Sequence, residues 1–242
     1  MANAGHKITI RLWITSFLLI ILNSCETNPP EPEIDYSGQR DTILDIDGNI
    51  YKTVGIGTQI WLAENLKVTR FTDGTQIPNI TENKDWKHGS LYTQGYCWYA
   101  NDSINNKTVY GALYNYFAVE KGSLCPTGWH VPSKNEWITL AKYLGGTNVA
   151  GGKLKESSGN YWKSPNNCFI NNNDFDALPG GYRKSILGDY FDIGNNGYWW
   201  TSTTLSTSDS HVYMFSMSYD NTYLQSNQRY KNEGLSVRCI KD

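Results

Sequence analysis

The stretch Cys125–Gly146 reads CPTGWHVPSKNEWITLAKYLGG, and it predicts a helix over residues 133–144. Pro132 precedes this helix, and Ser133 with Glu136 has the spacing of an S-x-x-E capping box. The glycine pair at 145–146 is typical of a helix end. Apolar residues recur on one face at helical spacing: Trp137, Leu140, Ala141 and Leu144. We therefore expect an amphipathic helix that lies on a core.

Upstream of this helix the sequence predicts strands joined by tight turns. Asp47-Gly48-Asn49 separates residues 44–46 from residues 50–51, and Asp-Gly is a strong hairpin signal. A second turn is expected at Gly57, and the strand after it ends at Leu62.

The rest of the chain predicts one more helix and three more strands. A short helix is expected over residues 110–119, and residues 147–196 are expected to be loops rich in Gly, Asn and Ser. Strand-like runs close the chain at 198–203, 211–217 and 235–240.

These elements predict the α+β class. Residues 41–242 have the length of a single domain. We expect two main helices, short antiparallel strands and long loops.

The N-terminus carries the signals of an exported protein. Lys7 and Arg11 precede an apolar run, residues 12–22, which is shorter than the about 20 residues that a membrane-spanning helix needs. Residues 1–24 are therefore expected to be a signal peptide. Leu22-Asn23-Ser24-Cys25 resembles a bacterial lipobox, in which cleavage precedes the cysteine and a lipid such as palmitate is attached to it. The alternative is an ordinary cleaved signal with an incidental Cys25.

Residues 25–40 predict a tether between the lipidated cysteine and the domain. Three prolines and several acids leave little to bury, so the segment is expected to stay extended and disordered. In bacteria of the Bacteroidetes type, which this chain resembles, acids after the cysteine can mark lipoproteins for the outer face of the outer membrane. We expect an outer-membrane anchor, with the cell surface favoured over the periplasmic face.

The charge and the aromatic content narrow the possible partners. Residues 1–24 hold two of the 21 basic residues and no acid, so 19 basic and 23 acidic residues remain, a net charge of −4. No run of basic residues is present, and a nucleic-acid partner is therefore not expected. The chain has 9 Trp, 17 Tyr and 7 Phe, side chains that fill irregular cores and also contact sugars and proteins.

Four cysteines remain after Cys25, and in an oxidising compartment they favour disulfides with three possible pairings. Their spacing matches no zinc site. We favour a Cys125–Cys239 bond, which would tie the segment before the main helix to the last strand. Cys97–Cys168 is then the remaining pair.

Several segments resemble the Fibrobacter succinogenes major paralogous domain family, in order and over nearly all of residues 43–242. They are Asp47–Leu66 (DGNIYKTVGIGTQIWLAENL), Cys125–Ser133 (CPTGWHVPS), Ala177–Arg183 (ALPGGYR), Tyr198–Ser202 (YWWTS) and Gly234–Cys239 (GLSVRC). The resemblance implies a secreted domain, usually a lipoprotein, with a C-type-lectin-like core. The family has no established biochemical function.

Two of these segments are more distantly similar to the formylglycine-generating/sulfatase-modifying fold, residues 130–137 and 234–239. That fold hosts an oxidase in which two cysteines bind copper, but residues 197–217 contain no cysteine here. The motifs H-E-x-x-H and G-x-S-x-G are also missing from the sequence. His130 is expected to form structural hydrogen bonds. We expect a protein that is not an enzyme and rank catalysis by spatially gathered acids last.

One segment is a candidate calcium site. Residues 171–176 read NNNDFD, and oxygen-bearing side chains at alternate loop positions suit Ca²⁺. Asp174 and Asp176 are the candidate ligands, although Asn/Asp clusters also form simple turns. Calcium is the only cofactor that we consider.

Ligand-binding residues are sought among exposed aromatics and a polar loop. In a strand neighbours face opposite sides, so one residue of the Trp199-Trp200 pair is expected to be exposed. Residues 219–230 (YDNTYLQSNQRY) have the chemistry of an adaptable binding loop, although a solvated loop without a ligand fits as well. The candidate contacts are Trp98, Trp200, Tyr219, Tyr223 and Arg229. We expect a carbohydrate or glycoconjugate held by loops within residues 160–230; the alternatives are protein adhesion and a structural role in a cell-surface assembly.

Overall fold

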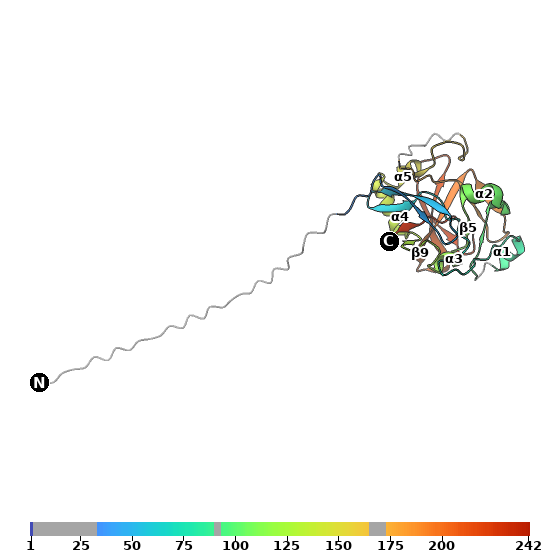
Figure 1. The fold of residues 1–242 in the computed structure, drawn as a ribbon, viewed down its shortest axis with the longest axis horizontal. Helices are drawn as coiled ribbons and strands as arrows, with labels where there is room; N and C mark the ends of the chain where they lie inside the picture. Colours follow the sequence, from blue (N-terminus) through green and yellow to red (C-terminus); the bar gives the residue numbers. More distant parts are fainter. Residues whose placement is uncertain (2–32, 90–92, 165–172) are drawn as a thin grey trace. The chain divides into compact units, whose positions relative to one another are not determined.

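The computed structural model describes residues 1, 33–89, 93–164 and 173–242, with the side chains of residues 88–89 left out. Residues Glu33–Asp242 make up one compact unit, and the following concerns that unit (Figure 1). Cys25, Cys168 and residues 2–24 of the predicted signal peptide lie outside the described residues. Within the described residues no helix is long and apolar enough to cross a membrane.

The helices and strands alternate irregularly along the chain. They are β1 (Arg40–Leu44), β2 (Ile50–Ile56), β3 (Gln59–Leu62), α1 (Asn83–Gly89), β4 (Tyr96–Cys97), a 3₁₀ turn (Tyr99–Asn101), α2 (Ser103–Tyr110), β5 (Leu113–Tyr114), α3 (Tyr116–Glu120), β6 (Trp129–His130), α4 (Lys134–Tyr143), α5 (Thr147–Leu154), β7 (Gly180–Arg183), β8 (Tyr190–Ile193), β9 (Asn196–Leu205), β10 (Ser208–Ser218), β11 (Gln225–Tyr230) and β12 (Ile240–Lys241). The mixture confirms the α+β class.

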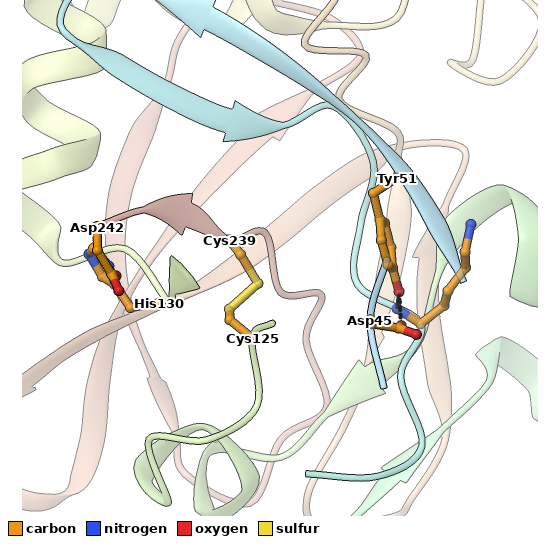
Figure 2. Close-up of a disulfide and its surroundings, with 7 residues drawn as sticks. Asp45, Tyr51, Cys125, His130, Cys239 and Asp242 are labelled. Atoms are coloured by element: carbon orange, nitrogen blue, oxygen red, sulfur yellow. Dashed lines mark hydrogen bonds and ion pairs between the residues drawn. A yellow bond between two sulfur atoms is a disulfide. The ribbon is translucent and has the colours of Figure 1, made fainter. Parts of the chain in front are cut away.

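The first sheet has the order β1-β2-β3-β12-β6 and is antiparallel throughout. The predicted hairpin is present, with Leu44 opposite Ile50. The Asp45 carboxylate closes the turn by accepting bonds from the backbone N–H of Asp47 and Asn49 at 2.9 Å. It also accepts a bond from the Tyr51 hydroxyl at 2.7 Å (Figure 2). The last strand, β12, lies between β3 and β6, so it is an inner strand of this sheet and not an edge strand.

The second sheet has the order β11-β10-β9-β7-β8. Its strands are antiparallel except for a parallel contact between β7 and β9. The expected strands at 198–203 and 211–217 are present and longer than predicted. The run 235–240 was wrong as a continuous strand: only Ile240–Lys241 forms one, while Leu235 and Ser236 make isolated bridges to Tyr114 and Trp199.

The main helix is confirmed, whereas the second predicted helix and one predicted loop are corrected. In α4, Ser133 and Glu136 form the capping box, with both of its bonds made. The helix predicted at 110–119 is broken because Gly111 has a φ of 74°, and a Cβ there would lie 2.7 Å from the Leu66 carbonyl oxygen. The predicted loop at 147–196 instead contains α5, β7 and β8.

The core consists of two large buried clusters, one on each face of the second sheet. Trp200 belongs to one cluster and Trp199 to the other. The second cluster joins the two sheets, since Trp61 of β3 and Trp199 of β9 both contact Trp137 of α4.

The folded unit begins earlier than the tether prediction allows. The N–H of Tyr36 donates to the carbonyl of Gly57 at 2.7 Å, and Gly55 donates to Gln39 at 3.0 Å. A Cβ on Gly55 would lie 1.9 Å from the Tyr36 carbonyl oxygen, so this segment lies directly against β2. Residues 36–40 are therefore part of the fold.

Buried cations fasten the irregular segments together. Arg238 donates to the carbonyls of Ala63 and Phe175, and Arg183 donates to those of Thr81 and Gly188. Lys155 donates to the carbonyl of Asn221 at 2.6 Å. Each of these side chains is fully buried. Burial lowers the pKa of Arg238 to about 9, with Asp176 and Glu64 opposing that shift.

The Cys125–Cys239 disulfide is confirmed, and it links the segment before β6 to the segment before β12 (Figure 2). The Cys97–Cys168 prediction is corrected, because Cys97 is a free thiol. It is buried in a small cluster with Trp86 and Leu113 and contacts Arg183.

Candidate functional site

A polar hollow of about 380 Å³ lies over the strands β9, β10 and β11. Three cross-strand pairs line the centre of the hollow. Ser216 of β10 lies opposite Tyr198 of β9 and opposite Gln225 of β11. Met214 of β10 lies opposite Asn227 of β11. The lining residues are Asn196, Tyr198, His211, Met214, Ser216, Met217, Ser218, Gln225, Asn227, Gln228, Arg229, Tyr230 and Glu233. We call this surface the β11 hollow.

Four amide side chains of the β11 hollow make no hydrogen bond within the described part of the chain. They are Asn196, Gln225, Asn227 and Gln228. Each amide offers two N–H donors and a carbonyl acceptor. Gln225, Asn227 and Gln228 are exposed and Asn196 is half-buried, so their donors and acceptors face solvent and are open to an external ligand.

Arg229 is the central charged residue of the β11 hollow. Its guanidinium lies 4.5 Å from the centre of the Tyr182 ring and 5.0 Å from that of Tyr198. Its Nη1 lies 3.5 Å from Oε2 of Glu233. Stacking and ion pairing hold the planar fork of Arg229 in place, and its remaining donors are available to a ligand oxygen.

Glu233 is almost fully buried beside Arg229. Its Oε2 accepts no hydrogen bond from the described residues. Burial raises the pKa of Glu233, and the nearby Arg229 and Lys184 only partly offset that effect. The ion pair of Arg229 with Glu233 places opposite charges side by side, so the pair adds little net charge to the hollow, which suits a neutral ligand rich in hydroxyl groups.

Tyr198 is fixed by a carboxylate at the edge of the β11 hollow. Its hydroxyl donates to Oδ2 of Asp192 at 2.6 Å. Burial and this hydrogen bond raise the pKa of Tyr198, so the phenol stays neutral. The opposite end of the hollow carries His211, whose ring contacts that of Tyr230 at 4.1 Å.

Of the predicted ligand contacts, only Arg229 lines the β11 hollow. Tyr223 lies beside it and is 46% exposed, whereas Tyr219 packs against the core with Lys163 over its ring. Trp98 and Trp200 were wrong as exposed platforms: Trp98 is 6% exposed and packs on Tyr96, and Trp200 is fully buried. Trp200 donates its indole N–H to the Tyr114 carbonyl at 2.7 Å.

The calcium candidates lie only partly within the described residues, because 171–172 are outside them. Asp174 is exposed and forms an ion pair with Arg40 at 2.8 Å. Asp174 and Asp176 both have positive φ, as Asp residues in turns commonly do. Among the described residues no group of three His, Cys, Asp or Glu could hold a metal ion.

His130 makes the hydrogen bonds expected of it. Its Nδ1 lies 2.6 Å from Oδ1 of Asp242 (Figure 2). Its Nε2 lies 2.8 Å from Oε1 of Glu136. Burial opposes the charged ring, but the bonds to Asp242 and Glu136 outweigh it and raise the pKa of His130. The same Glu136 caps α4 through Ser133, so this cluster fastens the C-terminus to the main helix.

Sequence reasoning missed most of the β11 hollow because it treated 219–230 as one loop. The structure places residues 225–230 in an edge strand, which brings Gln225, Asn227 and Arg229 into a row. These three residues are spaced two apart in the sequence, and this spacing could have indicated that they share one face of a strand. The residues next to Asn196 and Glu233 in the sequence do not indicate that these two side chains line the β11 hollow. Only the folding of the chain brings them to this surface.

These observations define a disulfide-bonded α+β domain with an open polar hollow on its second sheet. The chain belongs to the Fibrobacter succinogenes major domain family, whose model matches residues 54–241. No curated protein and no solved structure matches it significantly.

Proposed function

We propose that the domain binds carbohydrate in the β11 hollow and does so without catalysing a reaction. The observation that carries this proposal is the unused hydrogen-bonding capacity of Asn196, Gln225, Asn227 and Gln228 beside Arg229. A sugar presents hydroxyl groups that both donate and accept, as amides do. Tyr230, which lines the same hollow and is 46% exposed, supplies apolar surface for the ring face of a sugar.

We place this activity at the bacterial envelope. The lipobox-like sequence around Cys25 supports a lipid anchor in the outer membrane, with the domain facing the cell surface. The mixed helices and short strands are compatible with the C-type-lectin-like core that the family resemblance implies. Calcium at Asp174 and Asp176 remains part of the proposal as an optional cofactor.

A protein partner is the second candidate function, and one surface favours it. Leu44 and Ile50 lie opposite each other on the β1–β2 hairpin, and both are about 60% exposed. Exposed apolar residues paired on a sheet edge are typical of contact surfaces. This hairpin would then serve adhesion or a cell-surface assembly.

The test is a glycan array probed with residues 33–242 and with two matched variants. Asn227→Ala removes a side chain that bonds nothing within the described chain, so stability should be unchanged while glycan affinity falls about two- to tenfold. Gln39→Ala removes another exposed amide far from β11 in sequence and should leave binding intact.

The same array is read with calcium and with chelator. Loss of signal in chelator would support the calcium site, and equal signals would remove it. Glycan products in the supernatant would overturn the non-catalytic part of the proposal. No binding by folded protein would overturn the carbohydrate function, and the hairpin would then be tested with Leu44→Ser against envelope proteins.

A further inference from the structure

A second hollow of about 510 Å³ adjoins the β11 hollow. Its lining residues are Thr147, Asn148, Tyr223, Leu224, Gln225, Ser226 and Asn227. Gln225 and Asn227 line both hollows, so the two surfaces are continuous along β11. We call this second surface the Tyr223 hollow.

The loop that presents Tyr223 is bonded to α5 on both sides of that residue. The hydroxyl of Thr222 donates to the Asn148 carbonyl at 2.6 Å, and the N–H of Gly152 donates to the Thr222 carbonyl at 3.1 Å. The N–H of Leu224 donates to the Thr147 carbonyl at 2.8 Å. The backbone of Tyr223 is thus held between two fixed neighbours.

Two further contacts hold the loop of residues 221–224 close to α5. A Cβ on Gly151 would lie 2.3 Å from the Tyr223 carbonyl oxygen, so the loop can approach only because residue 151 has no side chain. The buried ammonium of Lys155 donates to the Asn221 carbonyl. A backbone fixed at residues 221–224 holds the point from which the Tyr223 side chain projects, so binding does not have to order this part of the loop, which lowers its entropy cost.

We propose that the two hollows form one extended surface that binds a glycan chain of several sugar units along β11. Tyr223 provides a stacking platform at one end, and Arg229 with its amides provides the hydrogen-bonding site at the other. The six residues of β11 span roughly 17 Å between first and last at about 3.4 Å each. This inference rests on the proposed carbohydrate function and specifies its ligand as a chain.

The experiment uses the full chain in detergent and oligosaccharide ladders, from disaccharide to hexasaccharide, of cellulose, starch and mannan type. Calorimetry should show affinity rising about tenfold with length in the ladder that binds. Tyr223→Ala should remove that gain for the hexasaccharide and leave disaccharide affinity unchanged. Tyr223→Phe keeps the ring and should bind as the unchanged chain does.

The control is Tyr143→Ala, which removes another exposed tyrosine that lines neither hollow. It should leave both affinities unchanged. Equal affinity for all lengths, or a Tyr223→Ala variant that binds the hexasaccharide normally, would overturn the extended surface while the carbohydrate function stands. Absence of binding to every ladder would overturn both.

Discussion

The indole ring of Trp137 is stacked on the phenyl ring of Phe215, with centroids 5.3 Å apart and planes inclined by 24°. Trp61 contacts the same indole at 4.9 Å and Trp199 at 6.2 Å. One side chain of α4 therefore touches β3 of the first sheet and both β9 and β10 of the second. The capped helix positions this residue, and the residue holds the sheets together.

Trp137→Ala should lower the free energy of unfolding by about 3–5 kcal/mol, because it leaves a cavity between the sheets. Urea unfolding followed by circular dichroism would measure this. Thr139→Ala, at an exposed position of the same helix, should change the free energy by less than about 0.5 kcal/mol. A Trp137 variant as stable as the Thr139 variant would contradict the central role of the indole.

The cluster of His130, Glu136 and Asp242 should make stability depend on pH in two opposite ways. The raised pKa of His130 gives stability that is present below its ordinary 6.5 and lost as pH rises through the higher folded value. Burial alone would raise the pKa of Glu136, but bonds from Ser133 and His130 lower it. Its contribution is present above its ordinary 4.5 and lost as pH falls through the lower folded value.

The contribution of this cluster should therefore be largest between about pH 4.5 and 6.5. Melting temperatures measured from pH 3 to 9 would show it as a difference between the unchanged chain and His130→Ala. That difference should shrink toward both ends of the range. A constant difference at every pH would show that packing of the ring, and not its charge, matters.

Loss of the disulfide should destabilise the domain by about 4–5 kcal/mol, because the bond closes a loop across a separation of 114 residues. Cys125→Ser with Cys239→Ser should unfold at lower urea than the oxidised chain, and reductant should not lower that midpoint further. Reductant should bring the unchanged chain to the same midpoint. Equal midpoints before and after reduction of the unchanged chain would contradict this account.

Lys155→Met should cost about 1.5–3 kcal/mol of folding free energy, since it leaves the Asn221 carbonyl without its charged donor. Urea midpoints would measure this loss. Lys142→Met, on an exposed position of α4, is the control and should have almost no effect. If the two variants unfold alike, the buried ammonium does not hold the loop.

Local signals predicted the parts of the fold that local interactions determine. The capping box of α4 and the Asp-Gly turn both depend on residues within four positions of each other, and both are present. Helix α5 was missed because Gly151 and Gly152 argue against a helix by propensity. A glycine is needed at position 151 because the backbone of Tyr223 approaches it closely, and these two residues are far apart in the chain.

The prediction of the candidate site was limited in the same way, because contacts between residues far apart in the chain determine which side chains are exposed. The alternation rule predicted that Trp199 or Trp200 would be exposed, but the second sheet has a buried cluster on each face and covers both. Arg229 and Tyr223, which line the two hollows, were predicted from their residue types, and their contact with a ligand stays a prediction. Strand β11 was missed because an exposed edge strand has no buried face and so no apolar period.

The position of β12 has a consequence for the order in which the domain can be completed. The first sheet cannot join β3 to β6 until Ile240 has arrived between them, and Cys125 must wait for Cys239. The chain that emerges earlier therefore has an open seam and an unpaired thiol. Any protease, oxidant or folding helper meets this unfinished form first, and the arrival of β12 and Cys239 ends its exposure.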